Sequence, residues 1–141
     1  DAAVELARGG EVDLLLLRVE PLDLLTHELY GELAATRQDD GRSGLLDAYR
    51  YLDRRTGELW NALDADDVLV VMSDHGIRTA LEHSTDAVFV AVGGGLAPGR
   101  APGQPEIAGV PAWLAGLFGV ETAWPRTGLA PAPAERAVAA R

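Results

Sequence analysis

The chain has 141 residues, no cysteine and a formal net charge of −10 at pH 7, and 48% of its residues are hydrophobic. This length fits one domain or part of one, with enough apolar side chains for a packed core. The net negative charge argues against non-specific nucleic-acid binding. The lack of cysteine excludes disulfides and thiolate metal sites. No apolar run reaches the roughly 18 residues that indicate a membrane span.

The N-terminal half alternates helical and strand-like stretches. A short helix is predicted over residues 2–8, and a pair of glycines ends it. Residues 13–19 (DLLLLRV) are an apolar run of strand length, typical of a strand covered on both faces, as in a parallel sheet between helices. After a break at Pro21, residues 23–35 have leucines at helical spacing, which predicts an amphipathic helix.

The middle of the chain continues this alternation. A polar loop, residues 38–43, leads into the longest predicted helix, residues 44–63, which carries most of an apolar stripe. The acidic stretch 64–67 (DADD) predicts a turn. This turn precedes a second predicted strand, residues 68–72 (VLVVM), so helices and strands continue to alternate.

The C-terminal part adds a third strand and a last helix, at residues 86–92 and 106–118. Strands that alternate with helices indicate an α/β fold with a mostly parallel sheet flanked by helices. We expect one domain portion over residues 1–124, followed by a Pro/Ala-rich tail over residues 125–141.

Residues that could bind a metal lie near the ends of these predicted strands. Asp23 follows the first strand, Asp74 and His75 follow the second, and His83 lies on the connection to the third. In a parallel sheet such positions meet at one edge. His27 lies one helical turn after Asp23, so the two side chains share a helix face.

Each of these residues also has an ordinary structural explanation. Asp23 could cap a helix, His27 could be a surface histidine, and the Asp-His-Gly stretch after Ser73 could be a turn. The predicted fold brings all of them to one edge, which favours a shared metal site. Three imidazoles and two carboxylates are too many for one tetrahedral ion and suit two divalent ions, zinc or manganese, of the kind that clamps phosphoryl groups.

The order of these motifs resembles the alkaline phosphatase superfamily, and in particular the type I phosphodiesterase / nucleotide pyrophosphatase family. The stretches that carry the likeness are LLLLRVEPLDLLTHELYG, YRYLDRRTGELWNAL, DDVLVVMSDHGI, EHSTDAVFVAVGGGLAPG and IAGVPAWLAGLFGV. The likeness implies an alkaline phosphatase-like fold, a phosphate-ester substrate and two metal ions, zinc in most members. It assigns Asp23, His27 and His83 to one ion, and Asp74 and His75 to the other.

The chain departs from the family pattern in several ways. Thr26 stands where the family usually has glycine. The nucleophilic Ser or Thr and a further metal-binding Asp belong to an N-terminal segment of the family that residues 1–10 do not match. We therefore expect the chain to be the C-terminal part of the domain and to be inactive alone. The short spacing between His75 and His83 leaves no room for the cap domain that many members insert there. Arg78 is a candidate for binding a phosphate oxygen.

Two other interpretations stay open at this stage. A phosphomutase or a sulfatase of the same superfamily would need only different chemistry in the absent segment. A non-catalytic chain could use the same ligands to stabilise its fold or an interface. A chain without its first strands exposes a sheet edge, so we also expect it to associate with itself or with the absent N-terminal part.

Overall fold

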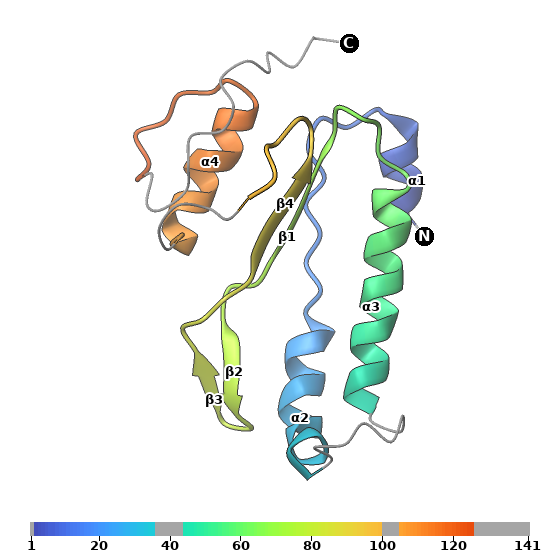
Figure 1. Cartoon of the computed structure of the whole chain (residues 1–141), viewed down its shortest axis with the longest axis vertical. Helices are drawn as coiled ribbons and strands as arrows, with labels where there is room; N and C mark the ends of the chain where they lie inside the picture. Colours follow the sequence, from blue (N-terminus) through green and yellow to red (C-terminus); the bar gives the residue numbers. More distant parts are fainter. Residues whose placement is uncertain (1, 36–43, 100–104, 126–141) are drawn as a thin grey trace. The chain divides into compact units, whose positions relative to one another are not determined.

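The computed structural model describes residues 2–35, 44–99 and 105–125 (Figure 1). The chain divides into two compact units, Asp1–Gly94 and Gly95–Arg141. In the described part, the first unit holds three helices and four short strands, and the second holds a 3-10 turn and one helix. The residues expected to bind metal all belong to the first unit.

The helices of the first unit confirm the helical stretches of the sequence, with shifted ends. They are α1 (Ala2–Gly9), α2 (Pro21–Ala35) and α3 (Gly44–Trp60). Helix α2 begins at Pro21 rather than after it, because the fixed φ and missing N–H of proline suit the first helical turn. Helices α1 and α2 both pack against α3, and Val4 of α1 and Leu45 of α3 are buried.

Four short strands form two antiparallel pairs. Strand β1 (Val68–Met72) pairs with β4 (Phe89–Gly93), from Val68 opposite Gly93 to Met72 opposite Phe89. Strand β2 (Gly76–Thr79) pairs with β3 (Glu82–Ser84). Because β1 leads into β2 and β3 leads into β4, the two pairs follow one another as a long, interrupted hairpin (Figure 1).

These strands correct part of the predicted fold. The strand at residues 68–72 is confirmed, and the one expected at 86–92 occurs slightly later, as β4. The mostly parallel sheet is wrong for the described residues, since both pairs are antiparallel. The β2–β3 hairpin was not predicted, because its residues are polar and its strands are too short to show a period.

The strand expected at residues 13–19 is also wrong, since this stretch connects α1 to α2 without strand pairing (Figure 1). An apolar run becomes a strand only when its backbone finds a hydrogen-bonding neighbour, and the described residues pair none with it. Its side chains are correspondingly exposed, with Leu16 at 73% of its full accessibility.

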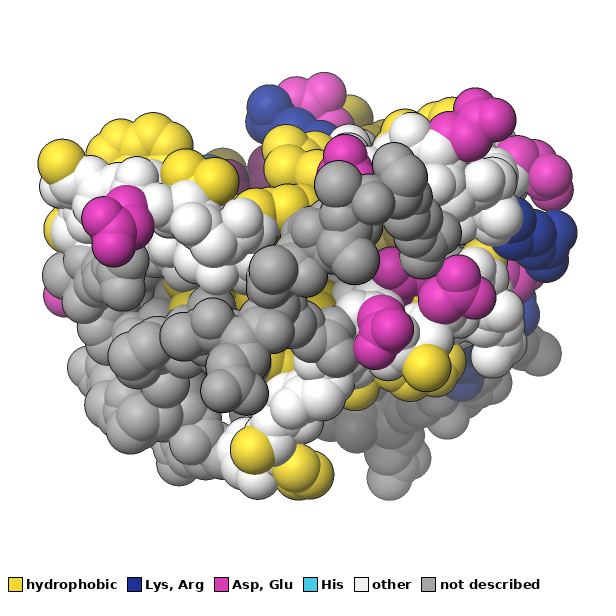
Figure 2. Space-filling model, turned by 90° about the horizontal axis from the view of Figure 1, so that it is seen from above, with side chains coloured by type: hydrophobic (Ala, Val, Ile, Leu, Met, Phe, Trp, Pro, Cys, Tyr) yellow, Lys and Arg dark blue, Asp and Glu magenta, His cyan; other side chains and the backbone are white. Residues whose placement is uncertain are grey.

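Apolar side chains are frequent on the surface of the described residues. Figure 2 shows exposed hydrophobic and acidic side chains among the described residues. The first unit exposes three leucines of the 11–19 stretch, Leu14, Leu16 and Leu17, as well as Val88, Val90 and Val92. Burying one such side chain stabilises a protein by about 1.5–3 kcal/mol, so this surface favours association.

The second unit contains η1 (Ile107–Gly109) and α4 (Val110–Leu117). These confirm the helix predicted at 106–118, with a tighter first turn before the proline at the start of α4. The predicted loop at 38–43 and nearly all of the predicted tail at 125–141 lie outside the described residues. Within the described ranges, no helix is long and apolar enough to cross a membrane.

Gly76 lies where the two strand pairs meet. A Cβ atom at this position would lie 2.5 Å from the backbone oxygen of Asp86 and 3.4 Å from the Cβ of Ser84. The first distance is well inside van der Waals contact, and the obstacle is backbone rather than a flexible side chain. The glycine of the Asp-His-Gly motif is therefore required for close passage of the chain toward β4.

We expect Gly76→Ala to lower the free energy of unfolding by about 1–3 kcal/mol, as overpacking does. The matched control is Gly57→Ala in α3, where an added Cβ meets nothing within 4 Å. That control should stabilise the protein by about 0.5–1 kcal/mol, because alanine favours a helix. Urea unfolding of both variants measures the difference, and equal effects would contradict the contact at Gly76.

We also expect the 141-residue chain to self-associate through its exposed 11–19 stretch. Leu16→Glu should shift the sedimentation coefficient toward the monomer, because a charge at this position opposes burial. Leu81→Glu is the control, since Leu81 is 93% exposed in the β2–β3 turn and lies outside that stretch. A wild-type chain that sediments as a monomer at high concentration would refute this expectation.

Candidate metal centre

Helix α2 supplies the first two side chains of the centre. Asp23 and His27 lie one turn apart, and the Nε2 atom of His27 is 3.4 Å from Oδ1 of Asp23. Their spacing on the helix places both side chains on one face. The stretch that the sequence identified as a metal-binding box is therefore an ordinary helical turn with both polar groups directed to the same side.

The β2–β3 hairpin supplies two more histidines. His83 lies on β3 opposite Ile77, and His75 immediately precedes β2. Positions 75 and 77 share a face because side chains alternate along extended chain, so His75 and His83 are diagonal neighbours. Their rings are stacked, with centroids 3.8 Å apart and an interplanar angle of 19°.

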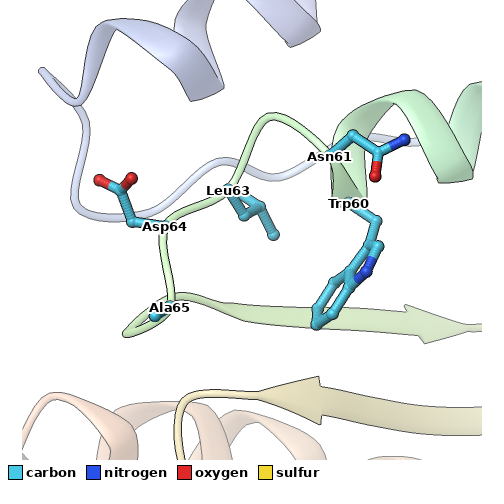
Figure 3. A pocket seen from close by; sticks show the side chains of 5 residues that line it. All are labelled: Trp60, Asn61, Leu63, Asp64 and Ala65. Atoms are coloured by element: carbon cyan, nitrogen blue, oxygen red, sulfur yellow. The ribbon is translucent and has the colours of Figure 1, made fainter.

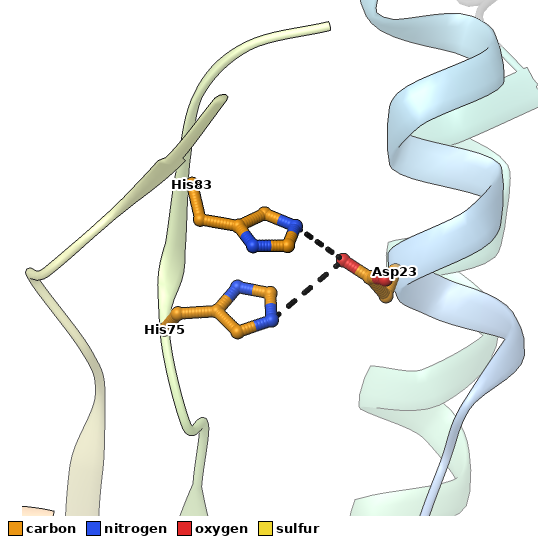
Figure 4. A group of neighbouring side chains, drawn as sticks. All are labelled: Asp23, His75 and His83. Carbon is orange, nitrogen blue, oxygen red and sulfur yellow. Dashed lines mark ion pairs between the residues drawn. The ribbon is translucent and has the colours of Figure 1, made fainter. Parts of the chain in front are cut away.

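The two histidines of the hairpin converge on one carboxylate oxygen of Asp23. Oδ1 of Asp23 lies 3.8 Å from Nε2 of His83 and 4.0 Å from Nε2 of His75. Figure 4 shows both imidazoles extending from the hairpin toward Asp23 on α2. The donor atoms of these three residues all lie within 4.8 Å of one another, which is close enough to share a metal ion.

His27 joins the same group from the helix. Its Nε2 atom is 2.8 Å from Nε2 of His83. The structure thus brings together four of the five predicted ligands, namely Asp23, His27, His75 and His83, hereafter the histidine group. They come from two distant segments, and His27 and His83 are 56 residues apart in sequence.

Backbone carbonyls orient two of the three imidazoles. Nδ1 of His27 lies 2.7 Å from the carbonyl oxygen of Ala80, and Nδ1 of His75 lies 3.2 Å from that of Gly76. A carbonyl can only accept a hydrogen bond, so each Nδ1 donates and the lone pair of a neutral ring is on Nε2. This arrangement is common for metal-binding histidines, because it fixes the tautomer and directs Nε2 into the site.

Asp74 lies at the rim of the group. Its side chain is 72% exposed, and its Oδ1 atom is 3.6 Å from Nε2 of His75. Nε2 of His75 is therefore close to two carboxylates, Asp74 and Asp23. The fifth predicted ligand is near the others, but it faces solvent much more than they do.

Arg78 and Ser73 have different surroundings. Arg78 is exposed on β2, and its backbone carbonyl accepts a hydrogen bond of 2.7 Å from the Tyr30 hydroxyl. Ser73 bridges the strands: its N–H donates to the carbonyl of Val88, and its hydroxyl accepts from the N–H of Val88. Ser73 therefore extends the β1–β4 pairing by one residue, which is a structural role.

Two residues near the centre were not identified as important from the sequence. Tyr30 follows His27 by three positions on α2, and this spacing could have indicated a shared face. Thr26, the residue that replaces the family glycine, is buried, with 5% of its surface exposed, and its hydroxyl donates to the carbonyl of Leu22. That bond satisfies the hydroxyl within the helix, so the threonine is accommodated without disturbing His27.

A separate hollow of about 310 Å³ lies between α3 and β1 (Figure 3). Its lining residues are Trp60, Asn61, Leu63, Asp64 and Ala65. It lies at the amino end of β1, whereas Asp74 and His75 follow the carboxyl end. Asp64 is the only ionisable residue of this lining, so the hollow offers little of the chemistry found at the histidine group.

The histidine group has a composition and spacing that could hold a divalent metal ion. Imidazole nitrogens and carboxylate oxygens bind zinc at about 2.0–2.2 Å, so neighbouring ligands of one tetrahedral ion lie roughly 3.3 Å apart. The separations of 2.8, 3.4 and 3.8 Å among the donor atoms of Asp23, His27 and His83 bracket that value. The residues present therefore fit a divalent metal ion.

The comparison with protein families agrees with this chemistry. The family model described as type I phosphodiesterase / nucleotide pyrophosphatase matches residues 1–94. This region coincides with the first compact unit and contains the whole histidine group. No curated protein and no solved structure matches the chain. Since the family match spans well over half of the sequence, the chain belongs to the type I phosphodiesterase / nucleotide pyrophosphatase family.

Proposed function

We propose that the protein containing this chain is a metal-dependent phosphoric ester hydrolase that cleaves phosphodiester or pyrophosphate bonds. Family membership supports a hydrolase of this general type. The observation that carries the specific proposal is the convergence of imidazole nitrogens on Asp23 from two distant segments. A group of this composition suits a divalent metal, and divalent metals suit phosphoryl transfer.

In this proposal the ligands hold two ions. Asp23, His27 and His83 hold one, and their donor atoms lie 2.8–3.8 Å apart. Asp74 and His75 hold the other, with donor atoms 3.6 Å apart. Zinc is the proposed metal, with manganese as the alternative, because histidine and carboxylate ligands accept both.

The metal ions, when bound, supply Lewis-acid stabilisation of charge on the transferring phosphoryl group and on the nucleophile. The chain carries a net charge of −10, which by itself repels an anionic ester. The side chains of Asp23 and Asp74 attract cations, and the oriented imidazoles add donor atoms without adding negative charge. Two divalent ions held by these residues would make the site locally positive on an acidic protein.

The nucleophile of this proposal is a Ser or Thr outside the 141 residues, so the chain alone is inactive. Ser73 is adjacent to Asp74, but it is poorly suited to attack an ester. Its hydroxyl oxygen already accepts a hydrogen bond of 2.9 Å from the N–H of Val88, and that bond holds it in the strand pairing. The proposal therefore leaves Ser73 in its structural role.

The first test is hydrolysis of bis(p-nitrophenyl) phosphate by the full-length protein with added Zn²⁺ or Mn²⁺. We expect His75→Ala to lower kcat by more than roughly 100-fold, because even residues that only support metal ligands cost 10–100-fold when removed. A chelator should abolish wild-type turnover, and restoring the metal should recover it. Wild-type turnover in His75→Ala would contradict the proposal.

The same assay separates the alternative reactions. Turnover of p-nitrocatechol sulfate in place of the phosphate diester would identify a sulfatase, and isomerisation of a sugar phosphate without hydrolysis would identify a phosphomutase. Failure to act on any of these esters, with metal bound, would favour a structural role for the metal ions.

We further propose that Arg78 binds a phosphate oxygen of the substrate. Arg78→Ala should then raise KM roughly tenfold, because a hydrogen bond to a charged group contributes about 1.5 kcal/mol. Arg54→Ala on α3 is the matched control, since Arg54 is exposed and outside the hairpin that carries the histidines. Unchanged kcat and KM in Arg78→Ala would exclude this role.

A further inference from the structure

One face of α2 carries a third polar side chain beyond the proposed ligands. Asp23, His27 and Tyr30 occupy positions i, i+4 and i+7 of the helix, so they form one row. Tyr30 is partly buried, and its hydroxyl donates a hydrogen bond of 2.7 Å to the carbonyl oxygen of Arg78. This bond joins the helix to the end of β2, 48 residues away in sequence.

The acceptor of this bond belongs to a residue that has no Cα partner in the β2–β3 register. In the β2–β3 register, Ile77 lies opposite His83 and Thr79 lies opposite Glu82, with an irregularity between Ile77 and Thr79. Arg78 is the extra residue at this bulge. An extra residue of a bulge drops out of the cross-strand hydrogen bonding, so its carbonyl is available to another donor. Tyr30 supplies that donor.

His27 makes a parallel contact one step further along the hairpin. Its Nδ1 atom donates to the carbonyl of Ala80, in the turn that joins β2 to β3. Tyr30 and His27 therefore hold two carbonyls, two residues apart, from one face of α2. The hairpin turn is fixed against the helix at two points.

This attachment joins the two segments that carry the histidine group. Asp23 and His27 come from α2, while His75 and His83 come from the hairpin. His27 would itself be a metal ligand, so its position depends on the ion. The bond from Tyr30 involves no ligand side chain, and it can hold the hairpin at the right distance from α2 before any metal binds.

We propose that Tyr30 is a positioning residue of the metal centre, which preorganises the ligands of α2 against those of the β2–β3 hairpin. The proposal rests on the proposed function, because it takes the histidine group to be a metal site. Through Arg78, the same bond also fixes the backbone of a residue proposed to bind substrate. A site held in place before binding has a higher metal affinity, because less ordering accompanies binding.

The test uses Tyr30→Phe in the full-length protein, which keeps the ring and removes only the hydroxyl. Affinity for Zn²⁺, measured by competition with a chromophoric chelator, should fall 10–100-fold, as it does when other supporting bonds are lost. The visible absorption of bound Co²⁺ should change in position or intensity, because ligand geometry is relaxed. Amide exchange in β2 and β3 of the metal-free protein should become faster.

Tyr51→Phe on α3 is the matched control. Tyr51 is exposed on another helix, so this variant should keep the affinity, the Co²⁺ spectrum and the exchange rates of the wild type. His83→Ala is the reference for loss of a proposed ligand. If wild type and His83→Ala bind Zn²⁺ equally, the metal site itself is refuted.

If His83→Ala loses the metal while Tyr30→Phe matches wild type in affinity and Co²⁺ spectrum, the role of Tyr30 is overturned and the proposed function stands. Faster hairpin exchange without any change in the metal readouts would also overturn it, since the bond would then be structural only. A weaker site with an altered spectrum, in a variant that unfolds at the wild-type urea concentration, supports the proposal.

Discussion

The close passage of the chain at Gly76 is the constraint on which the rest of the centre depends. The backbone oxygen of Asp86 occupies the space that a side chain at Gly76 would need. This contact lets the chain leave β1, form the short β2–β3 hairpin and return to β4. His75 and His83 are brought into ring contact at the base of this hairpin, where β2 and β3 pass side by side next to Gly76.

The candidate metal centre forms only where the hairpin meets α2. The helix presents Asp23 and His27 on one face, and the hairpin presents two imidazoles toward them. Backbone carbonyls orient His27 and His75, so the donor atoms face inward without needing other side chains. On a chain with a net charge of −10, this is a local arrangement of neutral donors and two carboxylates that can attract cations.

The first unit keeps an apolar stretch on its surface. The 13–19 stretch has the composition of a buried strand, yet its leucines are largely exposed. Composition predicts that a segment is suited to burial, but pairing requires a neighbouring backbone with free hydrogen-bonding groups. The same reasoning explains why the parallel sheet was wrongly predicted: apolar runs do not encode the direction or the identity of their partner.

The sequence by itself determined the helices, the strand that leads to Asp74, and the residue types of the centre, because periodicity and turn residues act over short distances. It also placed the motifs in an order that identifies the family. Only the tertiary structure decided that β1 pairs antiparallel with β4, that a bulged hairpin carries His83, and that Tyr30 reaches Arg78. These features depend on contacts between residues far apart in the chain, and local patterns carry no record of such contacts.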